Sequence, residues 1–310
     1  MGNISTIISL LKNNPKEIGK AIDSNISKWK IMQYLPDRIY LKIRYSLCLH
    51  KRLNFSNPVG FNEKLQWLKL YYRDPLYEKL VDKYLVKDYV KETYPDINLI
   101  PTIGVWERPE DIDFNLLPDQ FVLKCTHDTG STILCKDKTV FNISEAIKKL
   151  KNAQERNMYY PGREWVYKSI KPLIVAEPYL ADDGADELKD YKLMCFNGKV
   201  KCSFVCSDRF SPEGLHVTFF DRDWNVLPFI RHYPMRKDGI PKPYCYDKML
   251  QLAERMSKDM PFVRVDFYEI NKNVYFGEYT FFPGSGFEEF SPDEWDLIMG
   301  EWLTLPERNN

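Results

Sequence analysis

The stretch VRVDFYEINKNVYFGEYTFFPGSG, residues 263–286, joins two strand-like runs through a turn-prone Asn-Lys-Asn segment and ends in a glycine-rich loop. Arg264 and Asp266 are two residues apart on the first run, and Glu278 lies on the second. Pairing the runs about Lys272 sets Asp266 opposite Glu278, because each is six residues from the turn centre. Directly opposed residues of an antiparallel pair lie about 5 Å apart at Cβ, on one face. The stretch therefore predicts a hairpin with two adjacent carboxylates.

Two carboxylates this close repel each other unless a cation lies between them. Hard oxygen ligands beside phosphates suit Mg²⁺, so Asp266 and Glu278 are candidate metal ligands. The alternative is a surface hairpin whose acidic residues are unrelated. The opposed register and the neighbouring Arg264 favour the metal-site interpretation.

Composition argues against several classes of protein. Lysine and arginine total 44, as do aspartate and glutamate, so the net charge is zero and gives no electrostatic argument for binding nucleic acid. No apolar run is long enough to predict a transmembrane span, and the amino-terminal residues do not fit a signal peptide. The seven cysteines form no close CxxC pair, which is typical of reduced residues in a cytoplasmic protein.

The apolar pattern divides the chain into three expected parts. Residues 1–75 are helical in pattern, with amphipathic stretches near 7–11 and 28–35 and a basic segment at 38–52. We expect residues 76–180 to form a small mixed unit, and residues 181–310 to form a larger antiparallel sheet with helices. This order predicts the α+β class.

Local patterns predict most individual elements. Apolar residues spaced by three and four predict helices at 61–72 and 77–93. Further helices are expected at 144–157, at 246–260 and after a capping box at 291–294. Strands are expected at 121–127, 132–136, 173–180, 190–196 and 200–206, and a further pair at 214–221 and 225–229; Asn197-Gly198 predicts the turn of one hairpin.

Lys124 lies within an apolar strand, where an ammonium group costs free energy unless it meets an anion. The turn that follows, His-Asp-Thr-Gly-Ser-Thr at 127–132, contains Gly130 and Ser131, and the backbone N–H groups of such turns can bind phosphate. The alternative is a lysine that reaches water beside an ordinary hairpin turn.

Glu177 ends an apolar strand before Pro178, whose missing N–H leaves the strand partly unpaired and able to offer backbone groups to an adenine. The alternative is a bend between subdomains with a solvated glutamate. On the next strand, alternation places Asp190 and Lys192 on one face. They suit a ribose and a phosphate, or they form only a surface ion pair.

Six segments in order resemble the TupA-like branch of the ATP-grasp enzymes, over roughly residues 55–305. They are FNEKLQWLKLYY (61–72), DKYLVKDYV (82–90), LIPTIGVW (99–106), FVLKCTHDTGS (121–131), DYKLMCFNGK (190–199) and VRVDFYEINKNVYFGEYTFFPGSGF (263–287). The resemblance implies an ATP-grasp fold, in which two α+β subdomains hold ATP between them.

The resemblance also implies roles for the site residues. Arg264 and Lys192 would be catalytic, with Arg264 steadying an acyl-phosphate. Asp266 and Glu278 match the Mg²⁺ ligands, whereas Thr280 stands where related ligases have asparagine, so the number of ions is open. The expected substrate loop contains Gly284, Ser285 and Gly286. The expected nucleotide-binding residues are Lys124, Gly130, Ser131, Glu177, Pro178, Tyr179, Leu180, Asp190 and Lys192.

The expected function is an ATP-dependent carboxylate–amine ligase that uses Mg²⁺ and attaches an amino acid or peptide to a carboxyl sugar during surface polysaccharide or capsule biosynthesis. Two alternatives stay open. One is a metal-dependent glycosyltransferase that uses the pair Asp221 and Asp223, and the other is a catalytically silent ATP-grasp scaffold, which only Thr280 supports. The expected partners are small molecules or glycans in the cytoplasm, with peripheral membrane contact through residues 38–52 left open.

Overall fold

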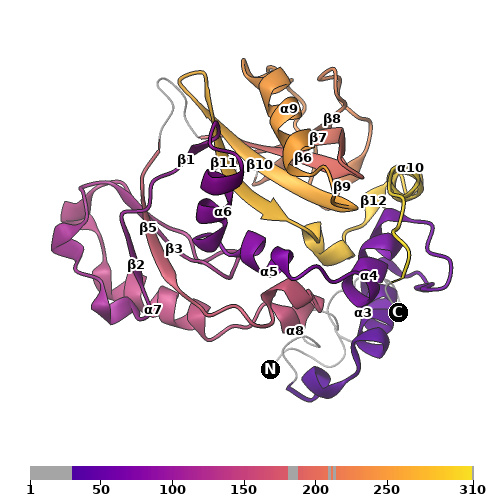
Figure 1. Cartoon of the computed structure of the whole chain (residues 1–310), viewed down its shortest axis with the longest axis horizontal. Coiled ribbons are helices and arrows are strands. Elements are labelled where there is room, and N and C mark those ends of the chain that lie inside the picture. Colours follow the sequence, from indigo (N-terminus) through magenta and orange to yellow (C-terminus); the bar gives the residue numbers. More distant parts are fainter. Residues whose placement is uncertain (1–29, 181–187, 209–210, 212–213, 309–310) are drawn as a thin grey trace, which may run out of the picture.

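The computed structural model describes residues 30–180, 188–208, 211 and 214–308. Two larger sheets and one short sheet make up its strands, and helices lie between and around them (Figure 1). The expected amphipathic stretch near 7–11 lies outside the described residues.

The larger sheet has six strands in the order β1-β11-β10-β6-β7-β8. Neighbouring strands are antiparallel, except that β1 runs parallel to β11. Helix α9 packs on the apolar face of this sheet through Met249, Ala253 and Met256. The strands are β1 (Asn98–Leu99), β6 (Asp190–Phe196), β7 (Lys199–Ser207), β8 (His216–Phe220), β10 (Phe262–Ile270) and β11 (Asn273–Thr280), and α9 is Tyr246–Met256.

The smaller sheet has four strands in the order β2-β5-β3-β4, all antiparallel. Helix α7 covers one face, with Leu150 and Ala153 in the same core as Phe121 and Leu123. The elements are β2 (Gly104–Trp106), β3 (Phe121–Cys125), β4 (Ile133–Cys135), β5 (Ile174–Pro178) and α7 (Ile143–Gln154).

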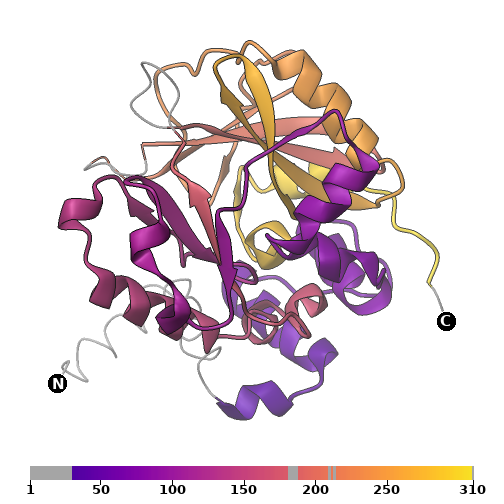
Figure 2. The ribbon, with the colours of Figure 1, turned by 60° about the vertical axis from the view of Figure 1, so that its left-hand side comes forward.

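The remaining helices and strands surround these sheets (Figure 2). Helix α4 anchors to the larger sheet because Phe61 lies 5.5 Å from Phe196 and 5.0 Å from Phe262, ring centre to ring centre. The helices are α3 (Asp37–Leu49), α4 (Phe61–Tyr71), α5 (Leu76–Val81), α6 (Leu85–Thr93), α8 (Tyr159–Gly162) and α10 (Glu294–Trp302). The 3₁₀ turns are η1 (Lys30–Tyr34), η2 (Pro109–Asp111), η3 (Phe114–Leu116), η4 (Lys138–Val140), η5 (Trp165–Tyr167) and η6 (Pro283–Gly286). The third sheet pairs β9 (Ile230–Arg231) with β12 (Phe290–Ser291).

The β10–β11 hairpin has the predicted pairing of Asp266 with Glu278, but it reaches that pairing by another route. The turn contains two residues, Asn271 and Lys272, at φ 49° and 60°, so Ile270 pairs with Asn273. An extra residue in β11 then shifts the register between Asp266 and the residue after it. The register prediction is confirmed, and the three-residue turn centred on Lys272 is wrong.

The β6–β7 hairpin is confirmed, with Asn197 and Gly198 at φ 47° and 76° in its turn. The predictions of a strand at 225–229 and of a capping box at 291–294 are wrong. Val226 makes only one isolated bridge, to Phe220, because the chain next pairs at 230–231 with β12 instead. The cap of α10 is Asp293 with no side-chain hydrogen bond, and its carboxylate forms an ion pair with Lys51.

The predicted helix at 77–93 is two helices, α5 and α6. Asp82 interrupts it, because its Oδ1 accepts the backbone N–H groups of Tyr84 at 2.8 Å and Leu85 at 2.9 Å. The backbone N–H of Lys83 instead donates to the carbonyl of Thr126 at 3.1 Å, just past β3. The break therefore ties the start of α6 to the smaller sheet.

Helices α5 and α6 lie between the two larger sheets (Figure 1). Their apolar side chains, among them Leu80, Val86 and Val90, belong to the core of the six-stranded sheet. Strand β1 joins that sheet as well. The proposed division of the chain at 75/76 and 180/181 stays a prediction, and the packing of residues 76–99 is shared with the carboxyl-terminal half.

Two general properties complete the description. No disulfide joins the seven cysteines, all of which lie within the described residues. Among the helices of the described ranges, none combines the length and apolar character that crossing a bilayer requires.

Candidate functional site

Arg264 lies between the two carboxylates of the hairpin. Its Nε donates to Oδ1 of Asp266 at 2.7 Å and one terminal nitrogen donates to Oδ2 at 2.7 Å. The same terminal nitrogen donates to Oε1 of Glu278 at 3.0 Å. A bidentate guanidinium–carboxylate pair of this kind is strong and fixed in direction. The arginine therefore holds the carboxylates together.

The two carboxylates differ in environment. Burial raises the pKa of Asp266, even though the charges of Arg264 and Lys192 oppose the change. Burial also acts to raise the pKa of Glu278, but the cations Lys83, Arg264 and Lys192 outweigh it and lower that pKa to about 2. Glu278 is therefore ionised under all ordinary conditions.

Strand β6 adds the predicted lysine and aspartate to the same face. Lys192 pairs with Asp266 in the sheet, and its Nζ lies 2.5 Å from Oδ2 of Asp266 and 3.3 Å from Oδ2 of Asp190. Burial lowers the pKa of Lys192, but the carboxylates of Asp190 and Asp266 more than offset burial and raise it. The prediction that Asp190 and Lys192 share a face is confirmed.

Lys124 finds its anion inside the protein. Oε2 of Glu177 lies 2.6 Å from Nζ of Lys124, and Oε1 lies 2.6 Å from Nζ of Lys87. Burial would raise the pKa of Glu177, but the two lysines lower it. The glutamate is thus not solvated, and its side chain positions both lysines.

The strand end after Glu177 keeps a partly unpaired backbone. Pairing of β5 with β2 ends at Ala176, whereas Pro178 still pairs with Phe121 of β3. Tyr179 lies beyond, with its ring centre 5.7 Å from Nζ of Lys136, and the half-buried Leu180 follows it. Their contact with adenine stays a prediction.

The turn after β3 is held by its own side chains. The hydroxyl of Ser131 donates to Oδ1 of Asp128 at 2.5 Å and accepts the backbone N–H of Cys125 at 2.8 Å. Gly130 is exposed, at φ 93°. The Ser131 hydroxyl is therefore engaged within the turn, and a phosphate there would meet backbone groups.

Lys83 connects this turn to the acidic hairpin, and the sequence did not single it out. Its Nζ donates to the carbonyl of Asp128 at 2.5 Å and lies 3.9 Å from Oε2 of Glu278. Lys83 precedes α6 and Lys87 lies in its first turn, and their spacing of four residues was the available signal.

Some of the predicted residues meet around one cavity of about 210 Å³, whose lining does not include Lys124, Glu177, Asp190, Lys192 or Asp266. The end of β11, the substrate loop, the turn after β3 and the segment at 164–167 line it. Its lining includes Asp128, Glu164, Tyr167, Arg264, Glu278, Thr280, Gly284 and Ser285. Glu164 and Tyr167 are additional to the predicted set, because nothing in their sequence neighbourhood indicates the hairpin that they face.

Side chains of helix α4 hold the substrate loop through hydrogen bonds to its backbone. Nζ of Lys69 donates to the carbonyl of Ser285 at 2.8 Å, and Nε2 of Gln66 donates to the carbonyls of Ser285 at 2.9 Å and Gly286 at 2.8 Å. These bonds hold Gly284, Ser285 and Gly286 in left-handed conformations, at φ 57°, 51° and 61°. Burial of Lys69 lowers its pKa to about 7.

The donor set suits Mg²⁺ only when a phosphate is present. Within the described ranges, no group of three histidine, cysteine or acidic side chains could hold an ion unaided. Asp266 and Glu278 supply two carboxylates, and Thr280, which pairs with Arg264, supplies a hydroxyl on the adjoining position. Mg²⁺ commonly binds one or two carboxylates together with substrate phosphates and water. The residue types fit that pattern, but both oxygens of Asp266 accept from Arg264 or Lys192, so a bound ion would have to displace one of these donors. The role of the three residues as ligands stays a prediction.

The Asp221-Arg-Asp223 motif lies in a turn that Asp221 stabilises through hydrogen bonds. Oδ1 of Asp221 accepts the backbone N–H groups of Asp223 at 2.9 Å and Asn225 at 2.8 Å. Its other oxygen accepts a hydrogen bond from the Asn225 side chain at 2.9 Å. Such capping is the ordinary use of aspartate in turns. The motif therefore has a local explanation that needs no nucleotide sugar.

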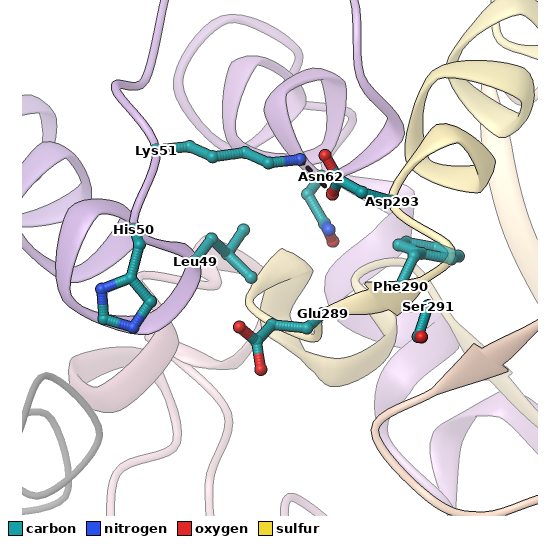
Figure 3. A pocket seen from close by; sticks show the side chains of 8 residues that line it. All are labelled: Leu49, His50, Lys51, Asn62, Glu289, Phe290, Ser291 and Asp293. Carbon is teal, nitrogen blue, oxygen red and sulfur yellow. Dashed lines mark hydrogen bonds and ion pairs between the residues drawn. The ribbon is translucent and has the colours of Figure 1, made fainter. Parts of the chain in front are cut away.

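A second pocket, of about 490 Å³, lies between the end of α3 and residues 289–293 (Figure 3). Its charged groups are partly paired, since Lys51 forms an ion pair with Asp293. The amide of Asn62 points toward it and donates to the carbonyl of Glu288 at 2.9 Å. None of the residues of the acidic hairpin lines this pocket.

Two separate sheets, with the acidic hairpin inside the larger one and helices α5 and α6 between them, form the architecture of an ATP-grasp protein. More closely, the chain belongs to the TupA-like ATP-grasp family, whose family model matches residues 63–304. Comparison with curated proteins gives no match.

Solved ATP-grasp ligases resemble the chain distantly. A D-alanine–D-alanine ligase from Bacillus anthracis, complexed with ATP, is 15% identical with a TM-score of 0.39, over 72% of this chain and 58% of that enzyme. A D-alanine–D-alanine ligase from Helicobacter pylori is 15% identical with a TM-score of 0.37, over 79% and 69%. D-cycloserine synthetase DcsG is 13% identical with a TM-score of 0.40, over 74% and 71%. The family model, not these likenesses, carries the assignment.

Proposed function

We propose that this protein is an ATP-dependent ligase that joins a carboxylate to an amine through an acyl-phosphate. One observation carries the proposal. Arg264, Asp266 and Glu278 form a single hydrogen-bonded cluster at a cavity that the substrate loop also lines. Membership of the TupA-like ATP-grasp family supports it.

The residues supply positions and charges rather than a nucleophile. A substrate carboxylate would attack the γ-phosphorus of ATP, the bond from that phosphorus to the bridging oxygen would break, and ADP would leave with the electron pair. Lys124, Lys192 and Arg264 would offset the charge of the transferring group. Asp266, Glu278 and Thr280 would hold Mg²⁺, which neutralises phosphate charge when bound.

The second half of the reaction needs an amine. The amine, after losing the proton of its ammonium form to water, would attack the acyl carbon through nitrogen. The C–N bond would form, the C–O bond to phosphate would break with the electron pair leaving on phosphate, and a second N–H proton would pass to water. Arg264 would face the developing negative charge in this step as well. No side-chain nucleophile takes part.

We infer the substrate class from the family. The acceptor would be a carboxyl-bearing sugar such as a uronic acid, and the amine an amino acid or peptide. The setting would be surface polysaccharide or capsule biosynthesis on the cytoplasmic side of the membrane. The basic face of α3 is available for a membrane-linked acceptor, with Arg38 and Lys42 exposed.

The test is a phosphate-release screen of sugar acids against amino acids and short peptides with Mg-ATP. We expect release that needs both an acid and an amine. Phosphate release with neither would show an ATPase, and none with any pair would favour the silent scaffold.

Nucleotide choice separates the ligase from a glycosyltransferase. We expect Mg-ATP to raise the melting temperature and Mg-UDP-sugars to leave it unchanged. A shift with a UDP-sugar alone would reject the ligase.

A further inference from the structure

Glu164 and Ser285 form a pair in the wall of the cavity that Glu278 and Thr280 also line. The hydroxyl of Ser285 donates a short hydrogen bond to Oε1 of Glu164. Both residues line the cavity that contains Arg264 and Glu278. The pair joins two segments far apart in the chain, the residues before η5 and the substrate loop.

The backbone makes room for this pair. A Cβ at Gly162 would lie 2.6 Å from Oε1 of Glu164 and 2.6 Å from Oγ of Ser285, closer than atoms can approach. A side chain at this position would have to push aside the carboxylate or the hydroxyl. Gly162 therefore leaves the space in which the two meet.

Glu164 lacks a direct cationic partner. Among the described residues, no lysine or arginine forms an ion pair with its carboxylate. Lys69 is near, but its ammonium group donates instead to Gln66 at 2.9 Å, to the carbonyl of Gly162 at 2.7 Å and to that of Ser285 at 2.8 Å. A carboxylate held away from water is costly unless a cation satisfies it.

The surroundings of Glu164 set its charge. Burial raises the pKa of Glu164, and the positive charges of Lys69 and Arg44 act against that rise. Tyr167 also faces it, and burial together with Glu164 and Glu278 raises the pKa of the Tyr167 hydroxyl, which therefore stays neutral. Burial therefore favours the neutral acid, and a bound cation would favour the carboxylate.

We propose that Glu164 and Ser285 form a subsite that binds the ammonium group of the amine substrate. The subsite rests on the proposed ligase function and adds a substrate class to it, a primary amine that is cationic in solution. The cavity lining then carries two groups that suit different parts of the substrates. Arg264 faces the carboxylate that becomes the acyl-phosphate, and Glu164 faces the amine.

The competing explanation is structural, with Glu164 serving only as the acceptor that holds Ser285 and the substrate loop. Glu164→Gln separates the two, because glutamine keeps the size and a hydrogen-bond acceptor while losing the charge. Glu164→Asp keeps the charge. Glu145→Gln, an exposed change on α7, is the matched control.

The test is calorimetric binding of two probe panels to the full chain with Mg²⁺ and a non-hydrolysable ATP analogue. Amino-acid amides carry an ammonium group without a carboxylate, and N-acetyl amino acids carry the reverse. We expect at least one amide to bind the wild type, Glu164→Gln to weaken it about tenfold or more, and Glu164→Asp and Glu145→Gln to retain most of the affinity. Nucleotide binding by each variant verifies its fold.

Two results would overturn the subsite: no amide binds the wild type, or Glu164→Gln binds the amide as tightly as the wild type. Phosphate release reports the ligase separately. Amide binding without phosphate release for any acid keeps the subsite and removes the ligase. If Glu164→Gln still releases phosphate with an unchanged KM for the amine, the ligase function is kept and the subsite is rejected.

Discussion

Asp266 and Glu278, which both accept hydrogen bonds from Arg264, differ in burial and in their other partners. Asp266 is almost fully buried and accepts from both Arg264 and Lys192, so its charge stabilises the fold as well as any reaction. The side chain of Glu278 is 32% exposed and touches the cavity. The sequence predicts two equal metal ligands, but losing Asp266 removes an ion partner from both Arg264 and Lys192, whereas losing Glu278 leaves the bidentate pair of Arg264 with Asp266 intact.

Glu278→Gln should therefore be the clean test of the reaction. We expect phosphate release to fall by about 100-fold or more, as when one charge-stabilising group is removed from an active site, while the circular dichroism spectrum stays the same. Asp266→Asn should lose activity and stability together. Asp223→Asn, in the turn, should keep phosphate release near that of the wild type. A severe loss of activity in this variant would favour the glycosyltransferase alternative.

The same residue predicts a pH dependence. The pKa of Glu278 is about 2 in the folded protein, below its usual 4.5. Between these values the unfolded chain binds more protons, so the stabilisation by Glu278 is complete above pH 4.5 and is lost as the pH falls towards 2. Urea unfolding at stepped pH should show a smaller loss on acidification for Glu278→Gln than for wild type. Parallel curves would contradict the prediction.

At the scale of one element, the bulge in β11 decides where Glu278 points. Val274 and Phe276 face the core, and strict alternation would send Glu278 to the same side. The extra residue, Gly277, reverses the alternation, so that Glu278 pairs with Asp266 on the site face. A one-residue register slip moves every later side chain to the other face.

Deleting Gly277 should leave Glu278 on the site face, because Glu278 then follows Phe276 directly and regular alternation sets it opposite Asp266. We expect this variant to keep most of its phosphate release. Gly277→Ala retains the bulge for comparison, since its Cβ would meet the carbonyl oxygen of Asp266 at 3.0 Å, a contact that a shift of a few tenths of an ångström relieves. Loss of phosphate release in the deletion variant alone would show that the bulge itself, and not only the face on which Glu278 lies, is required.

The sequence predicted most of the helices and strands, but it did not predict the irregularities within them. Alternation in β6 and the Asn197-Gly198 turn predict that hairpin because both signals are local. The break at Asp82 depends on a hydrogen bond to Thr126, far along the chain, so a periodic pattern continues through it. The pairing of Asp266 with Glu278 was predicted correctly because two departures from the assumed turn cancel.

At the scale of the molecule, lysines that precede or begin α6 join the two larger sheets. Lys83 reaches the turn after β3 and Glu278, and Lys87 reaches Glu177 on β5. The helix itself packs in the core of the six-stranded sheet through Val86 and Val90. The sequence pointed to Lys124 and Glu177 separately. It gave no indication that Glu177 forms ion pairs with both Lys124 and Lys87.

Glu177→Gln should reveal how much this junction contributes. The change leaves Lys87 and Lys124 without their shared anion in a largely buried setting, and breaking a buried pair costs about 3 kcal/mol or more. We expect urea unfolding to show a loss of that order, together with weaker binding of Mg-ATP because both lysines lose their position. Glu107→Gln is the control, since its ion pair with Lys171 is mostly exposed and should change the free energy of unfolding little. If the two variants lost equal stability, Glu177 would be an ordinary surface partner, and the two sheets would be joined by apolar packing and the bonds of Lys83 alone.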